Sequence, residues 1–397
     1  MSDKTEVFIA GAVRTPMGNF GGSLSALTAP ELGGIAAREA IGRAGLRPSH
    51  IEETVMGNAR AAGVGPNPAR QIARRAGVPD SSPAYTVNMA CGSSLRAILN
   101  GHQSIIAGDR EVVLVGGAEA MSRTPYLLEG ARFGYRMGHQ RLTDAMYRDG
   151  FLCPLCGQVM GETAENLVDK YGIGRAEQDA YSAETQQRCE RARRAGIFRD
   201  EIVPVRVPGR HGDTLVSEDE HPRDGVTPES LSRLPPVFRK EGTVHAGSSS
   251  GLVDAGAAMV LLSEAAIRRL GVRPMARIVD YTSVGVDPAV MGIGPVPAIR
   301  RLLEKTGMRL EDLDLIEINE AFAAQVLACH RELSFDLERT NVNGGAIALG
   351  HPIGATGARI TVSLLHEMRR RRARFGLSTL CISGGLGIAL LLESASC

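Results

Sequence analysis

Apolar and polar residues follow one pattern that occurs in both halves of the chain. Residues 85–108, YTVNMACGSSLRAILNGHQSIIAG, predict a strand, a Gly-rich turn and an amphipathic helix, and residues 111–121, EVVLVGGAEAM, predict a buried strand with a Gly-Gly pair. Residues 340–368, TNVNGGAIALGHPIGATGARITVSLLHEM, and residues 378–393, STLCISGGLGIALLLE, repeat this order. The second copy is longer by a glycine-rich insertion, so we interpret the two segments as related units.

A second pair of segments supports the same organisation. Residues 52–62, EETVMGNARAA, and residues 313–325, LDLIEINEAFAAQ, each predict a short strand that ends at an Asn. Short apolar strands that alternate with helices are typical of sheets covered on both faces. We therefore predict an α/β fold built from two pseudo-symmetric halves that pack across an approximate twofold axis.

Residues 121–244 interrupt the repeat. They are rich in charged residues and proline, as in SEDEHPRDGVTPESLSRLPPVFRKEG at 217–242, and they contain one clear helix, MGETAENLVDKYG at 160–172. Long irregular insertions in compact proteins are usually functional, so we predict a loop domain that covers a site; the predicted helix argues against a disordered linker. The expected division is residues 1–120 with 245–270, residues 121–244, and residues 271–397.

Composition excludes several classes of protein. The 397 residues carry a formal net charge of +1, so the total charge does not suggest a nucleic acid partner. The seven cysteines are odd in number and spread along the chain, which favours reduced thiols and a cytoplasmic location. The first residues lack the layout of a secretory signal, and no apolar run reaches the length of a membrane span.

Cys91 lies between a predicted strand and a predicted helix that begins near Ser93. Backbone N–H groups at a helix N-terminus stabilise negative charge, so we expect this position to lower the pKa of the thiol and favour a nucleophile. Gly92, Ser93 and Ser94 would leave room for a ligand and supply helix caps. The alternative interpretation is a small buried core residue.

Two further residues can act with this thiol. His351 lies in a glycine-crowded turn of the second half, where it can take a proton from a cysteine of the first half. Cys381 lies in the last buried strand, which pseudo-symmetry brings towards Cys91. Two cysteines and a histidine could bind zinc, but they lack paired ligands at short spacing, so acid–base chemistry is favoured and no metal is expected.

Two weaker candidates complete the set. Asn319 ends a predicted strand and begins a helix, where its amide could hold a water or an oxyanion or simply cap the helix. The CPLC pair at 153–156 looks like a metal or redox pair, but it has neither a second pair nor a thioredoxin-like strand before it. We therefore gave this pair little weight in the functional prediction.

Together, VNMACGSSLRA at 87–97, NEAFAAQ at 319–325, NGGAIALGHPIGATGAR at 343–359 and LCISGGLG at 380–387 resemble the active-site segments of the thiolases. TVHAGSSSGLVDAGAAMVLLSE at 243–264 is similar to a further segment of that family, and the resemblance covers essentially the whole chain. It implies five layers in the order αβαβα and an enzyme of fatty acid metabolism that makes or cleaves 3-oxoacyl-CoA.

The resemblance also implies roles for individual residues. Cys91 would be acylated, His351 would activate it, and Cys381 would move the proton of the second acyl-CoA. One oxyanion hole would combine His351 with a water held by Asn319, and the other would use the N–H groups of Cys91 and Ser383. Coenzyme A contacts are expected at Ser250, Arg223, Phe322, Met160, Met291 and Ala321.

Three positions depart from the family pattern. Ser94 replaces a usual Gly, and Ser383 replaces the first Gly of a Cys-Ile-Gly-Gly-Gly run, where a side chain restricts φ and could displace the second oxyanion hole. The run Gln158, Val159, Met160 stands where short-chain biosynthetic members have Tyr-His-Met. The missing His puts specialisation for acetoacetyl-CoA in doubt and leaves room for longer acyl chains.

We therefore predict a cytoplasmic acetyl-CoA C-acyltransferase with ping-pong kinetics. Acyl-CoA and CoA are the expected partners, without a further cofactor, a nucleic acid or a membrane, and the family implies a homodimer or homotetramer. Two alternatives are a decarboxylating ketoacyl synthase, which lacks a cysteine equivalent to Cys381, and a non-catalytic acyl-CoA-binding protein. Thiolytic or condensing direction, chain length and pathway stay open.

Overall fold

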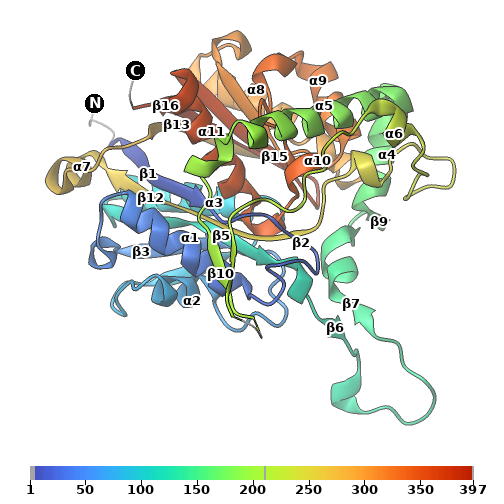
Figure 1. Ribbon diagram of the computed structural model, residues 1–397, viewed down its shortest axis with the longest axis horizontal. Coiled ribbons are helices and arrows are strands. Elements are labelled where there is room, and N and C mark those ends of the chain that lie inside the picture. Colours follow the sequence, from blue (N-terminus) through green and yellow to red (C-terminus); the bar gives the residue numbers. More distant parts are fainter. Residues whose placement is uncertain (1–4, 210–211, 396–397) are drawn as a thin grey trace.

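The computed structural model describes residues 5–209 and 212–395. The N-terminal stretch that was compared with a secretory signal therefore lies partly outside the described residues. The strands of its main sheet form one hydrogen-bonded path with two related sections (Figure 1). The first section has the order β4 (Ala84–Val87), β3 (Glu53–Gly57), β5 (Val112–Ala120), β12 (Val253–Ser263) and β1 (Val7–Arg14). The second has the order β14 (Leu315–Ile318), β15 (Phe375–Ile382), β16 (Leu386–Ser394) and β13 (Ala276–Gly285).

The two sections have matching topology, which confirms the predicted repeat. In the first, β3 pairs in parallel with both β4 and β5. In the second, β14 pairs in parallel with β15, and an isolated parallel bridge from Ile316 to Thr340 stands in the place of β4. A short antiparallel pairing, Phe8 with Arg277 and Ile9 with Ala276, connects the sections at β1 and β13.

Helices separate and cover the two sections, as expected for the αβαβα order. The central helices α3 (Ser93–Ile106) and α11 (Thr356–Arg371) share one apolar core with strand residues of both sections. One outer layer holds α1 (Ala29–Arg43) and α2 (Pro68–Arg75), and the other holds α8 (Pro295–Thr306) and α9 (Ala323–Leu333). The predicted α/β fold is confirmed, and β5 and β12 are buried along their whole length because helices cover both faces.

The segment between the halves is more helical than we predicted. The expected helix is α4 (Met160–Tyr171), but α5 (Arg175–Arg194) follows it directly. The sequence of α5 is dominated by charged residues, so the hydrophobic pattern that reveals most helices is weak. Its buried face includes Gln178, Asp179, Ser182 and Thr185, because α5 packs on polar loops as well as on the apolar core.

Candidate active site

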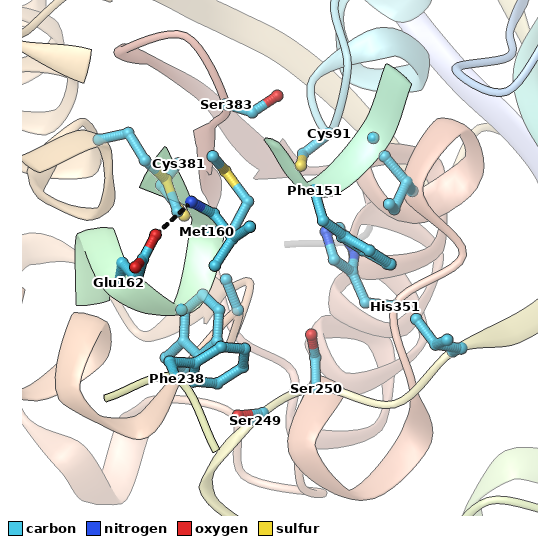
Figure 2. Close-up of a pocket in the computed structure, with 18 of the residues that line it drawn as sticks. Cys91, Phe151, Met160, Glu162, Phe238, Ser249, Ser250, His351, Cys381 and Ser383 are labelled. Atoms are coloured by element: carbon cyan, nitrogen blue, oxygen red, sulfur yellow. Dashed lines mark hydrogen bonds between the residues drawn. The ribbon is translucent and has the colours of Figure 1, made fainter. Parts of the chain in front are cut away.

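A cavity of about 460 Å³ opens where the two halves meet the segment between them, and it collects residues that are far apart in the sequence. Cys91, His351, Cys381 and Ser383 line it together (Figure 2). Cys91 follows β4, and Cys381 lies near the end of β15. The carboxyl ends of parallel strands are the usual place for ligand sites in α/β proteins.

The backbone around Cys91 is held in an uncommon conformation. Ala90 has φ of 45°, a left-handed conformation that a residue with a side chain rarely adopts. The Ser93 hydroxyl fixes this turn, because its Oγ accepts a hydrogen bond from Met89 N at 2.9 Å and donates to Ala90 O at 2.6 Å. The turn therefore presents Cys91 to the cavity directly before Gly92, the N-cap residue of α3.

The expected lowering of the Cys91 pKa is wrong. Burial raises the pKa of this thiol, and the N–H of Ser383 and the charge of Arg60 only partly oppose that effect. The serines do not cap α3 either, since Gly92 is the N-cap residue without a side-chain bond, and Ser94 Oγ accepts from Ala358 N at 2.9 Å in α11. Helix position alone does not compensate for the loss of water around the sulfur.

His351 is buried as a neutral base. Burial lowers the pKa of its imidazole to about 3, and the positive charges of Arg359 and Arg60 act in the same direction. Thr356 Oγ1 lies 2.6 Å from Nδ1 and donates its own proton to Pro352 O, so Nδ1 must carry the hydrogen. Nε2 has no protein partner and is therefore the nitrogen free to accept a proton.

The pKa shifts of Cys91 and His351 lead to a testable prediction for the reactivity of Cys91. Because the thiol pKa is raised and the imidazole pKa is about 3, we expect a neutral thiol–imidazole pair at pH 7. The rate of Cys91 alkylation by iodoacetamide should rise about tenfold per pH unit from pH 6 to pH 9, because only the thiolate reacts. A rate that stays constant from pH 5 to pH 8 would instead reveal a thiolate–imidazolium pair.

Cys381 is more deeply buried than Cys91. Its side chain is 1% exposed, and burial raises its pKa well above the usual value, with the nearby Cys91 sulfur adding to the effect. After Cys381 the chain turns through Ser383, Gly384 and Gly385, and both glycines have positive φ. Ser383 therefore occupies the position of this turn that tolerates a side chain, and the two left-handed positions keep glycine.

Asn319 lies behind the cavity wall. It is fully buried, it is absent from the residues that line the cavity, and neither its Oδ1 nor its Nδ2 has a protein partner. The interpretation as a helix cap fails, because α9 begins after Phe322. A buried amide without partners is costly, so this side chain is available to a ligand or a bound water.

Glu119 joins the two halves beneath the cavity. Its Oε1 accepts from Asn58 Nδ2 at 2.8 Å and from Arg60 N at 3.1 Å, and its Oε2 accepts from Ala59 N at 3.0 Å and Gly354 N at 2.8 Å. Gly354 belongs to the loop that carries His351. Burial raises the pKa of this carboxyl group, and Arg60 and the N–H donors oppose that effect.

We expect Glu119→Gln to lower the free energy of unfolding by about 3 kcal/mol. One carboxylate oxygen now accepts hydrogen bonds from two backbone N–H groups, and the amide nitrogen of Gln could not accept them. Urea denaturation of both proteins at pH 7 measures this difference. Glu39→Gln, in an exposed pair with Arg43, is the matched control and should change stability by less than about 1 kcal/mol. Equal stability of all three proteins would contradict this role.

Most of the predicted coenzyme A contacts share this cavity. Met160, Met291, Ala321, Phe322 and Ser250 line it, and Ser250 N donates to Ala321 O at 3.0 Å. Arg223 does not line the cavity. Its side chain is exposed, although it lies two residues after His221, which packs against Gly251 of the cavity wall.

Sequence analysis missed the aromatic part of the wall. Phe151 and Phe238 both come from the segment between the halves, and Phe238 packs edge-on against Phe322 with ring centroids 5.9 Å apart (Figure 2). The signal for Phe238 was an apolar pair, VF, inside the charged stretch at 217–242. Val159, one of the departures noted above, also lines the cavity and adds an apolar surface.

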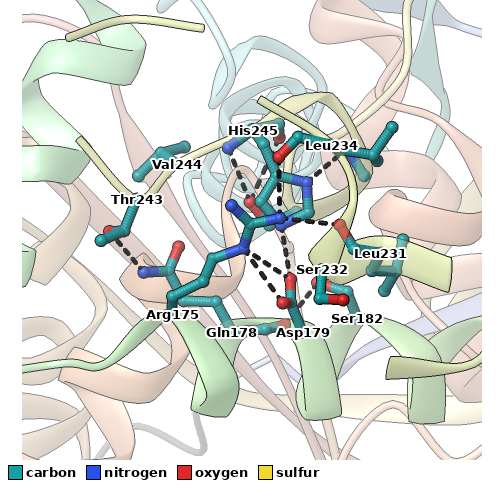
Figure 3. Close-up of polar contacts among 12 residues, drawn as sticks. Arg175, Gln178, Asp179, Ser182, Leu231, Ser232, Leu234, Thr243, Val244 and His245 are labelled. Atoms are coloured by element: carbon teal, nitrogen blue, oxygen red, sulfur yellow. Dashed lines mark hydrogen bonds and ion pairs between the residues drawn. The ribbon is translucent and has the colours of Figure 1, made fainter. Parts of the chain in front are cut away.

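A polar cluster supports the wall formed by residues 249–251 (Figure 3). Gly247 N donates to His245 Nδ1, so His245 Nε2 carries the hydrogen that is donated to Asp179 Oδ1 at 2.7 Å. Arg175 also pairs with Asp179 and donates to the carbonyl groups of residues 231 and 234. Helix α5 therefore makes hydrogen bonds both to the 245–251 loop and to the segment 231–238 that leads to Phe238.

In the part of the chain that the structure describes, no group of three or more His, Cys, Asp and Glu side chains is arranged to hold a metal ion. Within residues 5–209 and 212–395, no helix has both the length and the apolar character that crossing a bilayer requires.

Comparison with known proteins agrees with this geometry. Residues 7–265 match the model of the thiolase N-terminal domain, and residues 272–394 match that of the thiolase C-terminal domain. The chain is 53% identical to an acetyl-CoA acetyltransferase of Pseudomonas aeruginosa, over 98% of this chain and 99% of the relative. It is 50% identical to an acetyl-CoA acetyltransferase of Chromobacterium violaceum, also over 98% of this chain and 99% of the relative.

Solved structures show the same relationship. The acetyl-CoA acetyltransferase of Bacillus anthracis superposes with a TM-score of 0.96 at 46% identity, covering 98% of this chain and 99% of the other. Human mitochondrial 3-ketoacyl-CoA thiolase in complex with CoA superposes with a TM-score of 0.95 at 44% identity, covering 98% of both chains. The two matched domains together span nearly the whole chain, and the chain therefore belongs to the thiolase family.

Proposed function

We propose that this protein is an acetyl-CoA C-acyltransferase that catalyses thiolytic cleavage of 3-oxoacyl-CoA and the reverse Claisen condensation. The observation that carries this proposal is the convergence of two thiols and one neutral imidazole on a single cavity. One thiol can hold an acyl group while the other moves a proton, and a reaction that joins or separates two acyl units requires both.

In the condensing direction, Cys91 attacks the carbonyl carbon of a first acyl-CoA, and His351 Nε2 takes the thiol proton and passes it to the departing CoA sulfur. The product of this half-reaction is an acyl-Cys91 thioester and free CoA. Cys381 then passes its own proton to His351, and the resulting thiolate removes a proton from the methyl carbon of acetyl-CoA. The carbanion attacks the thioester, and the departing Cys91 sulfur takes the proton held by His351, which restores the enzyme. Thiolysis is the same sequence in reverse.

Each oxyanion needs donors that are aimed before charge develops. The N–H of Ser383 acts to lower the pKa of the Cys91 thiol, so it faces the sulfur that would carry the acyl group. The unpartnered amide of buried Asn319 supports the second hole, in which Asn319 acts through a water together with His351. Removing one such donor costs about 3 to 4 kcal/mol of transition-state stabilisation in other enzymes.

Coenzyme A is the proposed carrier, and its pantetheine arm would lie along the wall formed by Ser250, Phe322, Met160 and Met291. Arg223 is proposed as a contact for the charged nucleotide end, because its side chain is exposed near this wall. No further cofactor enters the steps above. Residues 121–244 are proposed to act as a cover, because Phe151, Met160 and Phe238 of this segment complete the cavity.

The alternatives are less well supported. A decarboxylating ketoacyl synthase does not need a second thiol, yet Cys381 lines the cavity with Cys91. A non-catalytic binding protein does not need an imidazole that is held as a neutral base, yet burial keeps His351 neutral.

A homodimer or homotetramer in the cytoplasm completes the proposal. The segment between β6 (Tyr126–Leu127) and β7 (Thr143–Asp144) projects from the body of the protein (Figure 1) and exposes Phe133 and Met137, each 92% accessible. Exposed apolar side chains of this kind favour contact with another subunit. The six described cysteines are free, in keeping with a reducing compartment.

Thiolysis rates against a series of 3-oxoacyl-CoA substrates test the function. Because Val159 and Phe151 give the cavity an apolar wall, we expect six- and eight-carbon substrates to be cleaved with kcat/KM within about tenfold of the four-carbon substrate. Cleavage of the four-carbon substrate alone would contradict the proposed room for longer chains. Failure to cleave any member would overturn the proposed activity.

A further inference from the structure

The CPLC segment forms the tip of a hairpin whose two arms border the cavity. Strand β8 (Leu152–Cys153) pairs with β9 (Gln158–Val159), and Gly157 N donates to Cys153 O at 2.9 Å. Phe151 directly precedes β8, and Met160 directly follows β9; both line the cavity, as does Val159 itself. A change in this turn is therefore transmitted to the cavity wall on both sides.

The turn brings two thiols together. Cys153 and Cys156 are free cysteines three positions apart, and each thiol shifts the pKa of the other. In a turn closed by a bond between positions i and i+4, residues i and i+3 have Cα atoms within the separation that a disulfide spans. Cys153 is 2% exposed and Cys156 is half-buried, so a small oxidant reaches the pair from the side of Cys156.

The two thiols differ in acidity. Burial raises the pKa of Cys153, but the N–H groups of Cys156 and Leu155, the Cys156 thiol and the N–H of Gly384 outweigh it, and the pKa is lowered. Burial raises the pKa of Cys156, and the neighbouring Cys153 sulfur raises it further. Cys153 is therefore the thiol that reacts as a thiolate, and Cys156 keeps its proton.

The same short turn serves both this pair and the nucleophile. The N–H of Ser383 acts to lower the pKa of the Cys91 thiol, and the N–H of the next residue, Gly384, acts to lower the pKa of the Cys153 thiol. The hairpin also touches this turn, since Leu155 Cδ1 lies 3.9 Å from the Cβ position of Gly384. Anything that moves the Cys153 sulfur therefore acts on the backbone that carries the Ser383 N–H.

We propose that Cys153 and Cys156 are a redox modification site, and that their disulfide lowers catalysis by displacing the hairpin and the Ser383–Gly384 turn. The effect on catalysis rests on the proposed function, whereas formation of the disulfide does not. With a hydroperoxide as oxidant, the Cys153 thiolate attacks the peroxide oxygen and becomes a sulfenic acid as water is released. The Cys156 sulfur then attacks that sulfur and a second water leaves. Two thiols are oxidised and one hydrogen peroxide is reduced.

The first experiment maps the bond. The full-length enzyme is treated with equimolar hydrogen peroxide, free thiols are alkylated after denaturation, and peptides are analysed by mass spectrometry. We expect the peptide with residues 153 and 156 to lose two hydrogens, to escape alkylation and to recover with dithiothreitol. The proposal would be overturned if Cys153 and Cys156 were both still alkylated under conditions that already oxidise Cys91. It would also be overturned if the pair held stoichiometric zinc instead of forming a disulfide.

The second experiment measures the effect on the cavity. Thiolysis by the oxidised enzyme should fall at least about tenfold and return with dithiothreitol, because sub-ångström shifts at a catalytic donor have effects of this size. Cys156→Ser should lose the dithiothreitol-reversible fraction, while Pro154→Ala, which changes an exposed residue of the same turn, should retain it. A mapped disulfide that leaves thiolysis unchanged would overturn control of the cavity by this pair.

Discussion

Replacing Cys381 with Ala is expected to abolish carbon–carbon bond formation while leaving acylation of Cys91 intact. Cys381 lines the cavity with Cys91, and the lining has no Asp or Lys that could take its place. Its other ionisable groups are His351, which serves Cys91, and Tyr147 and Glu162. A general acid–base group contributes about 10² to 10⁴ in rate. Exchange of acetyl-CoA methyl protons with deuterated water, followed by NMR, measures the lost step directly.

Cys329→Ala is the matched control for this variant. Cys329 is also a buried thiol of the second half, but it lies in α9 and does not line the cavity. It should keep proton exchange close to that of the unchanged protein. Normal exchange in Cys381→Ala would show that another group removes the methyl proton and would contradict the role given to Cys381.

The second large effect is expected from His351→Asn. Because the pKa of the imidazole is about 3, His351 is neutral at working pH and its free Nε2 is the base for Cys91. Acylation of Cys91 by acetyl-CoA should slow by about 10² to 10⁴. Stopped-flow release of CoA in the first half-reaction measures the change without contribution from Cys381.

The sign of the pH dependence distinguishes the roles of this histidine. The folded imidazole stays neutral down to about pH 3, whereas an unfolded histidine binds a proton near its usual pKa of about 6.5. His351 therefore lowers stability as the pH falls below 6.5, and His351→Asn should unfold less readily than the unchanged protein at pH 5. His102→Asn, which removes a half-buried imidazole of α3 outside the cavity, should leave acylation unchanged. Slow acylation in both variants would assign the effect to folding.

Sequence patterns predicted the fold and the centre of the site because both rest on local signals. The repeated order of strand, glycine-rich turn and helix fixes the two halves, and the ends of β4, β14 and β15 then place Cys91, Asn319 and Cys381 near one edge. The matched pairing of β3 with β4 and of β14 with Thr340 shows how closely the second half follows the first. Glycine-rich turns carry this information because few other residues fit them.

The remainder depends on contacts between distant segments, which no local pattern encodes. Helix α5 has a weak hydrophobic pattern because it is held by polar bonds such as that between Asp179 and His245. Phe238 and Phe151 reach the cavity only after the segment between the halves has folded over it. The direction of the Cys91 pKa was wrong for the same reason, since burial by these segments outweighs the effect of the α3 N-terminus.

The central claim is that Cys91 alone carries the acyl group between the two half-reactions. The most direct test is mass spectrometry of the protein mixed with acetyl-CoA at neutral pH and quenched in acid, followed by peptide mapping. Our account predicts one acetyl group, on the peptide that contains Cys91, that is removed when free CoA is added. Absence of an adduct, or an adduct on Cys381 in its place, would contradict it.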